Sequence, residues 1–388
     1  MFNHPNLVFS LDEYKRRISF VREQMKQQGV ELAIFTDQEH LTYLTGHQTS
    51  GYDSFHALLI PLTGECFSFT RVLEESNFLQ RTWVTKTFTY LDTEKPIQKL
   101  IELIKDHNTD LKSLGLELDS FFLRRDTIET LRNNFKQKEI INISRILDPI
   151  RRVKSSEELE LMKKVAHITE EAMLAGIEAS KVGVTENEIA AKVHEAMYLA
   201  GGEYPSVPPY IVTGERTNIG HGTWEHRKVQ KGDCVFLELA GCLQRYHTAM
   251  MRTLVIGPAP KEMLEAEKIA LEALAKSMEN MKPGVSVGKI ASANRDIIAS
   301  NQCGGWQTGR SGYGIGISFA PAWDEGHLVS LNPVSNQLLE ENMTIHLIPF
   351  FMMPKIKMIM GISETVVVTP NGAKSLFDRP ERKLIIKD

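Results

Sequence analysis

The sequence predicts an α+β protein built from two domains, residues 1–150 and 151–388. Three observations support this fold class. The chain has 388 residues, which is long for a single domain. Short apolar strands alternate with helical segments up to about residue 150, a pattern typical of α/β domains. In the remainder, long amphipathic helices flank a strand, a turn and a returning strand between residues 234 and 256.

The first domain opens with a predicted amphipathic helix over residues 10–30. Ser10 can cap its start, apolar side chains recur at helical spacing, and Gly29 ends it. Two more helices are predicted near residues 95–108 and 122–136, alternating with short strands.

A Gly-rich loop in the first domain carries Tyr52, Asp53 and His56. Loop residues of this kind often bind ligands because a rigid scaffold positions them. An ordinary solvated loop is the alternative for this segment.

The second domain is predicted to begin with a long helix that starts near Ser156 and has an apolar stripe. Further helices are predicted over residues 184–202, 260–281 and 282–300. Most of these segments serve packing in this interpretation.

The stretch 221–253 contains the strongest candidate site. Glu238 lies in the middle of a mostly apolar strand, and a buried carboxylate is costly unless it is paired or used. We expect the two adjacent strands to bring His221 and His247 close to Glu238. The alternative is a strand acid that a neighbouring arginine neutralises.

Composition excludes several classes of function. The net charge is −4 and the pI about 6.3, so no basic surface for nucleic acid or anionic lipid is indicated. The four cysteines show no zinc or disulfide spacing. No apolar run reaches the length of a membrane span, and no signal peptide is visible at the start. The sequence therefore predicts a cytoplasmic protein without nucleic-acid or membrane partners.

Several motifs resemble the pita-bread family of methionine aminopeptidases, prolidases and creatinase, in the right order along the chain. They are RRVKSSEELELMKKVAHITEEAM, the hairpin with Glu238, SGYGIGISFAPAWDEG, ENMTIHLIPFF and MGISETVVVTPNG. The resemblance implies a creatinase-type α/β amino-terminal domain followed by a pita-bread catalytic domain. It also implies a homodimer whose amino-terminal loop, with Tyr52 and Asp53, can complete a neighbouring subunit's site.

The resemblance also locates five metal-ligand positions, and this sequence departs from four of them. Metal-dependent members use two Asp, one His and two Glu to hold two divalent ions. Here those positions carry Glu238, Ala249, Tyr313, Ile348 and Ser363. Alanine and isoleucine cannot bind a metal ion, and a one-residue shift to Glu364 does not replace them. The sequence therefore predicts no metal site and no cofactor.

Within this family, the chain resembles the metal-free ectoine hydrolases through LELAGCLQRYHTAMMRT and SFAPAWDEG. Departures include Gly361, where that group has an acid, and the partly kept loop SGYDSF. The resemblance implies catalytic roles for Glu238, His221, His247, Glu364 and Tyr313. It implies substrate binding by Tyr52, Asp53, His346 and Trp323.

We therefore expect a metal-independent hydrolase that cleaves a C–N bond of a small amidine- or guanidine-like substrate. Glu238 would act as nucleophile or base, and His221 would move the proton, because histidine titrates near neutral pH. Two alternatives stay open. One is a Xaa-Pro dipeptidase or aminopeptidase, and the other is a pita-bread binding protein without catalysis.

Overall fold

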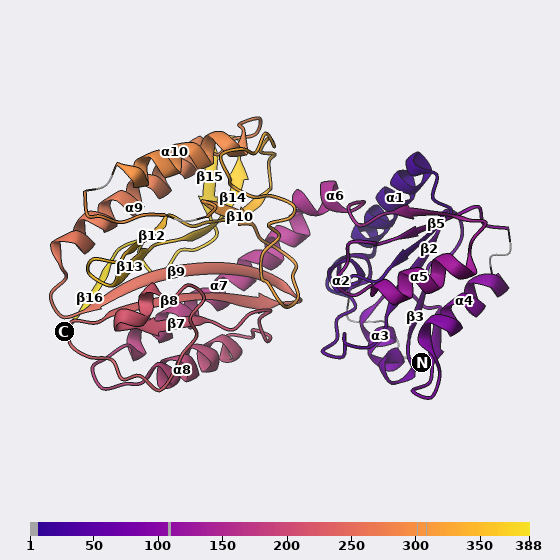
Figure 1. Ribbon diagram of the computed structural model, residues 1–388, viewed down its shortest axis with the longest axis horizontal. Coiled ribbons are helices and arrows are strands. Elements are labelled where there is room, and N and C mark those ends of the chain that lie inside the picture. The colour runs from indigo at the N-terminus through magenta and orange to yellow at the C-terminus, as the bar shows by residue number, and fades with distance from the viewer. Residues whose placement is uncertain (1–6, 108–109, 301, 308) are drawn as a thin grey trace. The chain divides into compact units, whose positions relative to one another are not determined.

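The structure is a computed structural model that describes residues 7–107, 110–300, 302–307 and 309–388. It divides into two compact units, Met1–Arg151 and Arg152–Asp388 (Figure 1). Each unit combines helices with sheet, which confirms the predicted fold class.

The first unit is built on a mixed six-stranded sheet in the order β4-β3-β2-β1-β5-β6. Strand β2 is antiparallel to both β1 and β3, whereas β5 is parallel to both β1 and β6. The strands are β1 (Leu32–Phe35), β2 (Ala57–Pro61), β3 (Phe67–Arg71), β4 (Thr87–Tyr90), β5 (Ser113–Leu116) and β6 (Glu139–Asn142). The helices are α1 (Leu11–Gln28), α2 (Gln38–Thr45), α3 (Glu75–Arg81), α4 (Pro96–His107), α5 (Arg125–Asn134) and α6 (Asp148–Arg152).

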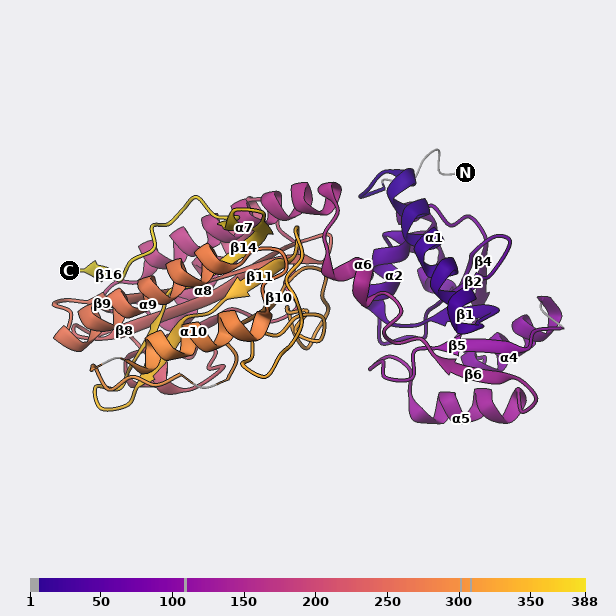
Figure 2. The same ribbon diagram turned by 90° about the horizontal axis from the view of Figure 1, so that it is seen from above.

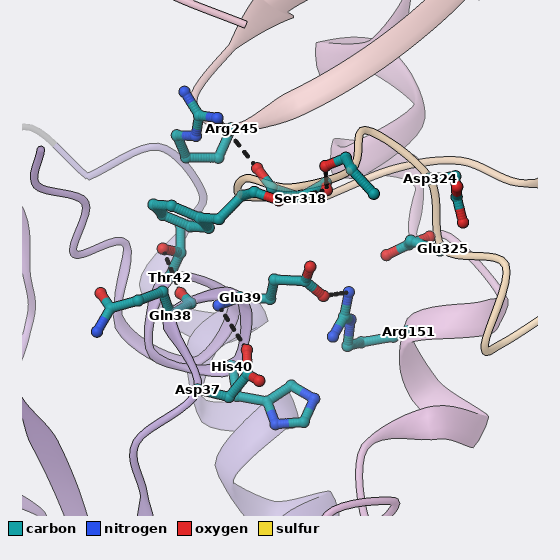
Figure 3. Close-up of polar contacts among 12 residues, drawn as sticks. Asp37, Gln38, Glu39, His40, Thr42, Arg151, Arg245, Ser318, Asp324 and Glu325 are labelled. Atoms are coloured by element: carbon teal, nitrogen blue, oxygen red, sulfur yellow. Dashed lines mark hydrogen bonds and ion pairs between the residues drawn. The ribbon is translucent and has the colours of Figure 1, made fainter. Parts of the chain in front are cut away.

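The ends of α1 match the sequence prediction. The Ser10 side chain accepts a hydrogen bond from the backbone of Glu13, and Gly29 closes the helix in the left-handed conformation at φ 72°. A partly buried ion pair between Glu39 and Arg151 at 2.6 Å fastens α2 to α6 within this unit (Figure 3).

The second unit contains one long hairpin and several shorter antiparallel strands. One sheet has the order β16-β9-β8-β7, another β10-β11-β14-β15, and β12 pairs with β13. The strands are β7 (Tyr210–Thr213), β8 (Cys234–Leu243), β9 (Tyr246–Ile256), β10 (Gly312–Gly314), β11 (Thr344–Leu347), β12 (Phe350–Met353), β13 (Met358–Gly361), β14 (Glu364–Thr369), β15 (Gly372–Ser375) and β16 (Ile385–Lys387).

The α-helices that cover these sheets in the described part of the chain are α7 (Ser156–Ala179), α8 (Glu186–Leu199), α9 (Lys261–Asn280) and α10 (Val287–Ala299). Helix α7 packs along β8 and β9, while α9 and α10 lie side by side, with α9 contacting β13 and β15 (Figure 1 and Figure 2). Ser155 caps α7 in a reciprocal pair with Glu158, one residue before the predicted start. Gly241 permits the close packing, because a Cβ there would lie 2.7 Å from Oγ1 of Thr169 on α7.

A two-residue turn fixes the register of the β8–β9 hairpin. Gln244 and Arg245 both have positive φ, at 51° and 64°, which suits the twist of a tight hairpin. The Arg245 guanidinium holds the turn by donating to the carbonyl of Ser318 (Figure 3). It also donates to Oγ of Ser206. The hairpin is thereby locked in the register that pairs Glu238 with Met251.

The segment from β13 to β14 lies against β9 and closes one side of the unit. The backbone of Met251 donates to Oγ of Ser363 at 2.6 Å, and that of Ala249 donates to Oγ1 of Thr365 at 2.9 Å. These bonds bring β14 alongside the strand that faces Glu238.

Candidate active site

A cavity of about 370 Å³ opens in the second unit between the hairpin and β10. Its ionisable side chains, among the residues that the structure describes, are Glu238, His221 and Arg310, with two tyrosines, Tyr210 and Tyr313. The rest of the wall is mainly apolar, formed by Val212, Phe236, Met251, Ile348, Phe350 and Met352. The cavity therefore suits a small ligand with few polar groups.

Glu238 is the buried acid of this cavity. It is 8% exposed, and it makes no hydrogen bond or ion pair with any residue within the described ranges. Burial raises the pKa of its carboxyl to about 8, because a charge is unfavourable among apolar neighbours. The acid is therefore largely protonated at neutral pH until a cation enters.

His221 reaches the cavity from the loop that follows a 3-10 turn at Gly214–Asn218. Its backbone is left-handed, with φ 56°, and its ring stacks on Tyr210 with centroids 5.2 Å apart. Tyr210 in turn contacts the ring of Trp323 at 5.3 Å. Burial raises the pKa of Tyr210 to about 12, so the phenol in this aromatic wall stays uncharged.

A hydrogen-bonded chain runs from Tyr313 into the core. Trp323 Nε1 donates to the Tyr313 hydroxyl at 3.0 Å, and that hydroxyl lies 2.8 Å from Nδ1 of His346. On the far side of the ring, Nε2 of His346 lies 2.7 Å from Oγ of Ser363. The chain fixes the Tyr313 hydroxyl at the cavity wall.

His346, the histidine of this hydrogen-bonded chain, is neutral. Burial, helped by the charges of Arg310 and Arg252, lowers the pKa of His346 to about 3. A neutral imidazole carries one proton, so it donates at one nitrogen and accepts at the other. When Nδ1 holds the proton, Tyr313 accepts from both Trp323 and His346, and its own hydrogen is left for a ligand. His346 therefore positions Tyr313 and does not line the cavity itself.

The structure corrects the prediction for His247. It pairs with Cys242 on the hairpin, whereas Glu238 pairs with Met251 four residues further along β9. Four strand residues span about 13 Å, so His247 lies outside the cavity. Its Nε2 accepts a hydrogen bond from the backbone of Ser206 at 3.1 Å, and burial holds its pKa well below the usual value.

Glu364 also differs from the prediction. Its carboxylate accepts a hydrogen bond from Arg252 Nη2 at 2.7 Å and contacts the Ser375 hydroxyl, with Arg382 at 3.4 Å. It is 1% exposed and absent from the cavity wall. This acid already has a cationic partner and is not available to balance a substrate's charge.

Tyr52 and Asp53 belong to the first unit and line a separate hollow of about 490 Å³ there, together with Phe122. The Tyr52 ring packs edge-on against Phe122 at 6.0 Å. His56 bonds Oγ1 of Thr70 at 2.7 Å, a contact that holds the loop to β3. The prediction that Tyr52 and Asp53 complete a neighbouring subunit's site stays a prediction.

The fold and its site define a class of protein. The model of the creatinase/prolidase N-terminal domain matches residues 17–153, and that of metallopeptidase family M24 matches residues 160–370. The chain belongs to metallopeptidase family M24, and it is a hydrolase of that family.

Individual relatives share both domains with this chain. An ectoine hydrolase from Halomonas elongata is 26% identical, covering 98% of this chain and 99% of its own. A Xaa-Pro dipeptidase from Pyrococcus horikoshii is 28% identical, covering 97% of this chain and 100% of its own.

Solved structures show the same fold. The prolidase from Pyrococcus horikoshii superposes with a TM-score of 0.82 at 25% identity, over 95% of this chain and 100% of that one. The Xaa-Pro dipeptidase from Bacillus anthracis also gives 0.82, at 21% identity, over 96% and 99% of the two chains. No helix in the described part of the chain is long and apolar enough to cross a membrane.

The side chains at the expected ligand positions do not fit a pair of metal ions. Ala249 is buried beside Thr365, Ile348 belongs to the apolar wall, and Ser363 is hydrogen-bonded to His346. Within the described ranges, no three His, Cys, Asp or Glu side chains come together as a metal site. Glu238 and Tyr313, which stand at two of the expected ligand positions, both line the cavity.

Arg310 is the cavity residue that the sequence interpretation missed. It stands three residues before Tyr313, ahead of β10, and its guanidinium lies 4.2 Å from the centre of the Tyr313 ring. A lone arginine in a Gly-rich segment gives no periodic signal, but its proximity to a metal-ligand position could have drawn attention to it.

Proposed function

We propose that this hydrolase cleaves a C–N bond of a small cyclic amidine without a metal ion, as in the ring opening of ectoine. The observation that carries the proposal is Glu238, a buried carboxyl at the wall of a cavity with no partner among the described residues. Ala249 and Ile348 support the metal-free part, because neither can bind an ion.

A cationic amidine complements this acid. An unpaired buried carboxylate is costly, and a cation that enters the cavity removes that cost. An amidinium presents parallel N–H groups that can bond both carboxylate oxygens. The aromatic rings of Tyr210 and Tyr313 add a favourable surface for a flat cation. Binding would lower the pKa of Glu238 and ionise it where the reaction takes place.

The chemistry follows from the charge on the substrate. The central carbon of an amidinium is electrophilic, so Glu238 can attack it directly or take a proton from an attacking water. When water attacks, a C–O bond forms to the water oxygen, one C–N bond breaks, and the departing nitrogen takes up a proton. When Glu238 attacks, the C–O bond forms to its carboxylate, the same C–N bond breaks, and a water molecule then hydrolyses the covalent intermediate to restore the carboxylate. His221 is the group on the cavity wall that can supply that proton. The Tyr313 hydroxyl donates a hydrogen bond to a polar atom of the reaction intermediate.

Peptidase activity is the second candidate, favoured by the Xaa-Pro dipeptidase at 28% identity. Against it stands the loss of the ligand set on which the metal-dependent reaction relies.

A substrate panel separates these functions. The purified protein is assayed with ectoine, other small amidines and guanidines, and Xaa-Pro dipeptides, with product formation followed by mass spectrometry. The proposal expects turnover of a cyclic amidine. Cleavage of Xaa-Pro dipeptides alone contradicts it, and saturable binding of an amidine without product identifies a binding protein.

A further inference from the structure

The cavity that holds Glu238 contains a second fixed charge, Arg310. Its side chain is 34% exposed and pairs with Asp324, with Nη2 donating to Oδ2 at 2.8 Å. This is its one hydrogen bond to the described residues, so most of its N–H groups are left for a ligand. Asp324 is itself held by the backbone N–H of Gly326 at 2.6 Å. The guanidinium is therefore oriented in advance and not saturated.

Arg310 and Glu238 line the same cavity as Tyr313, and no ion pair joins the two charged side chains within the described ranges. The guanidinium sits against the Tyr313 ring at 4.2 Å, while burial alone accounts for the raised pKa of Glu238, without a contribution from Arg310. Burial is the main cause of the raised pKa of the Tyr313 hydroxyl, and this hydroxyl also senses both charges, since Glu238 raises its pKa further and Arg310 lowers it. The cavity thus offers an acid and a cation without an ion pair between them among the described residues.

We propose that Arg310 binds a carboxylate on the substrate and so selects a zwitterion, with its amidinium at Glu238 and its carboxylate at the guanidinium. The amidinium half of this assignment rests on the proposed function. A planar guanidinium matches a carboxylate through two parallel hydrogen bonds. The amidinium of such a ligand pairs with the acid, and its carboxylate accepts from the N–H groups of Arg310 that Asp324 does not occupy. Arg310 is therefore the specificity residue of the cavity, and Asp324 is its positioning residue.

The test compares ectoine, a cyclic amidine with a carboxylate, with the same ring lacking that carboxylate. A charged hydrogen-bonded contact contributes about 1.5–3 kcal/mol, so the wild-type kcat/KM should favour ectoine by about 10- to 150-fold. Arg310→Gln should abolish this preference, mainly by raising KM for ectoine. It should change kcat/KM for the compound without the carboxylate by less than about threefold. Arg310→Lys should keep part of the preference, since it retains the charge but not the fork.

Arg295→Gln is the matched control, because Arg295 is exposed on α10 and lines a different hollow. It should preserve the preference. Equal losses on both compounds in Arg310→Gln would mean that Arg310 only supports Tyr313, and an absent preference in wild type would also overturn the assignment.

Calorimetric binding of both compounds keeps this test separate from the proposed function. If the wild type binds ectoine more tightly, Arg310→Gln removes this difference and neither compound is turned over, the carboxylate-binding role of Arg310 is supported and hydrolysis is contradicted. Turnover of both with equal affinity contradicts Arg310 alone. Failure of both compounds to bind contradicts both proposals.

Discussion

Two buried acids in the second unit, Glu238 and Glu364, have opposite surroundings. Glu364 on β14 is 1% exposed and paired with Arg252, while Glu238 on β8 is 8% exposed and has no partner in the described structure. The first satisfies its charge inside the protein, and the second can do so with a ligand. The contrast teaches that a partner, more than burial, separates a structural acid from a functional one.

Alternation along β9 creates this difference. Met251 lies opposite Glu238 and lines the cavity, whereas its neighbour Arg252 points to Glu364. Successive side chains of a strand face opposite sides, so two adjacent residues serve the cavity and the core respectively. A shift of the hairpin register by one residue would turn Met251 toward the core and Arg252 toward the cavity. The turn at Gln244 and Arg245 prevents this shift.

Glu238→Gln should have the largest effect on catalysis. Loss of a general acid–base group typically lowers rates by about 10²- to 10⁴-fold. In addition, the glutamine amide cannot ionise and so cannot form an ion pair with a cationic substrate. Steady-state kinetics on the amidine substrate measure this. Circular dichroism should show an unchanged fold, and near-wild-type turnover would return Glu238 to the role of a strand acid.

Glu364→Gln should act on stability. Removing one partner of a buried ion pair costs about 3–5 kcal/mol, because the Arg252 charge is left uncompensated. Denaturant unfolding at neutral pH measures the change in the free energy of unfolding, with Glu238→Gln as the matched variant. The distinction between a structural Glu364 and a functional Glu238 is contradicted if Glu238→Gln is the more destabilised of the two variants.

The two histidines of the loop after β7 sharpen the comparison further. Both side chains are exposed, but His221 lines the cavity of Glu238, whereas His226 is not part of the wall. His221→Ala should lower kcat by about 10² or more, since the departing nitrogen loses its proton donor. His226→Ala should leave kcat unchanged, and equal effects of the two substitutions would exclude a catalytic role for His221.

The pH dependence of kcat/KM should show the unusual acid directly. Only ionised Glu238 can bind an amidinium, and its pKa in the free enzyme is about 8. The value of kcat/KM should rise about tenfold per pH unit below the pKa of Glu238. A rise that ends about three pH units lower would indicate an acid with an ordinary pKa.

The ionisation of Glu238 should also affect stability, but the free energy of unfolding should fall with rising pH where kcat/KM rises. The folded state holds the Glu238 proton more tightly than the unfolded state, where the pKa is near 4.5. Stability is therefore lost as pH rises from about 4.5 to about 8, by about 1.4 kcal/mol for each pH unit in that range. Glu238→Gln should remove this loss, so unfolding curves of the two proteins should diverge with rising pH.

The sequence was sufficient for the fold class and for Glu238 as a buried strand acid. Periodicity and turn residues locate helices and strands, and an acid in an apolar strand is visible without coordinates. The position of His247 could not be predicted, because it depends on the hairpin register and not on which strands are adjacent. The homodimer and the cytoplasmic location stay predictions.

Long-range partners account for the other differences. Glu364 meets an arginine 112 residues earlier in the chain, and His346 meets Ser363 across two strands. Neither pairing leaves a local pattern in the sequence. Tyr313, by contrast, was predictable because its motif position is tied to the site, and the structure places it on the cavity wall.

The most direct test of metal-free hydrolysis is the turnover of a cyclic amidine by protein that has been exhaustively treated with a chelator. Metal content is determined by elemental analysis on the same sample, and manganese, cobalt or zinc is then added back. The account predicts full activity in the chelated protein and no gain from any of the ions. A large loss on chelation that one of these ions restores would contradict it.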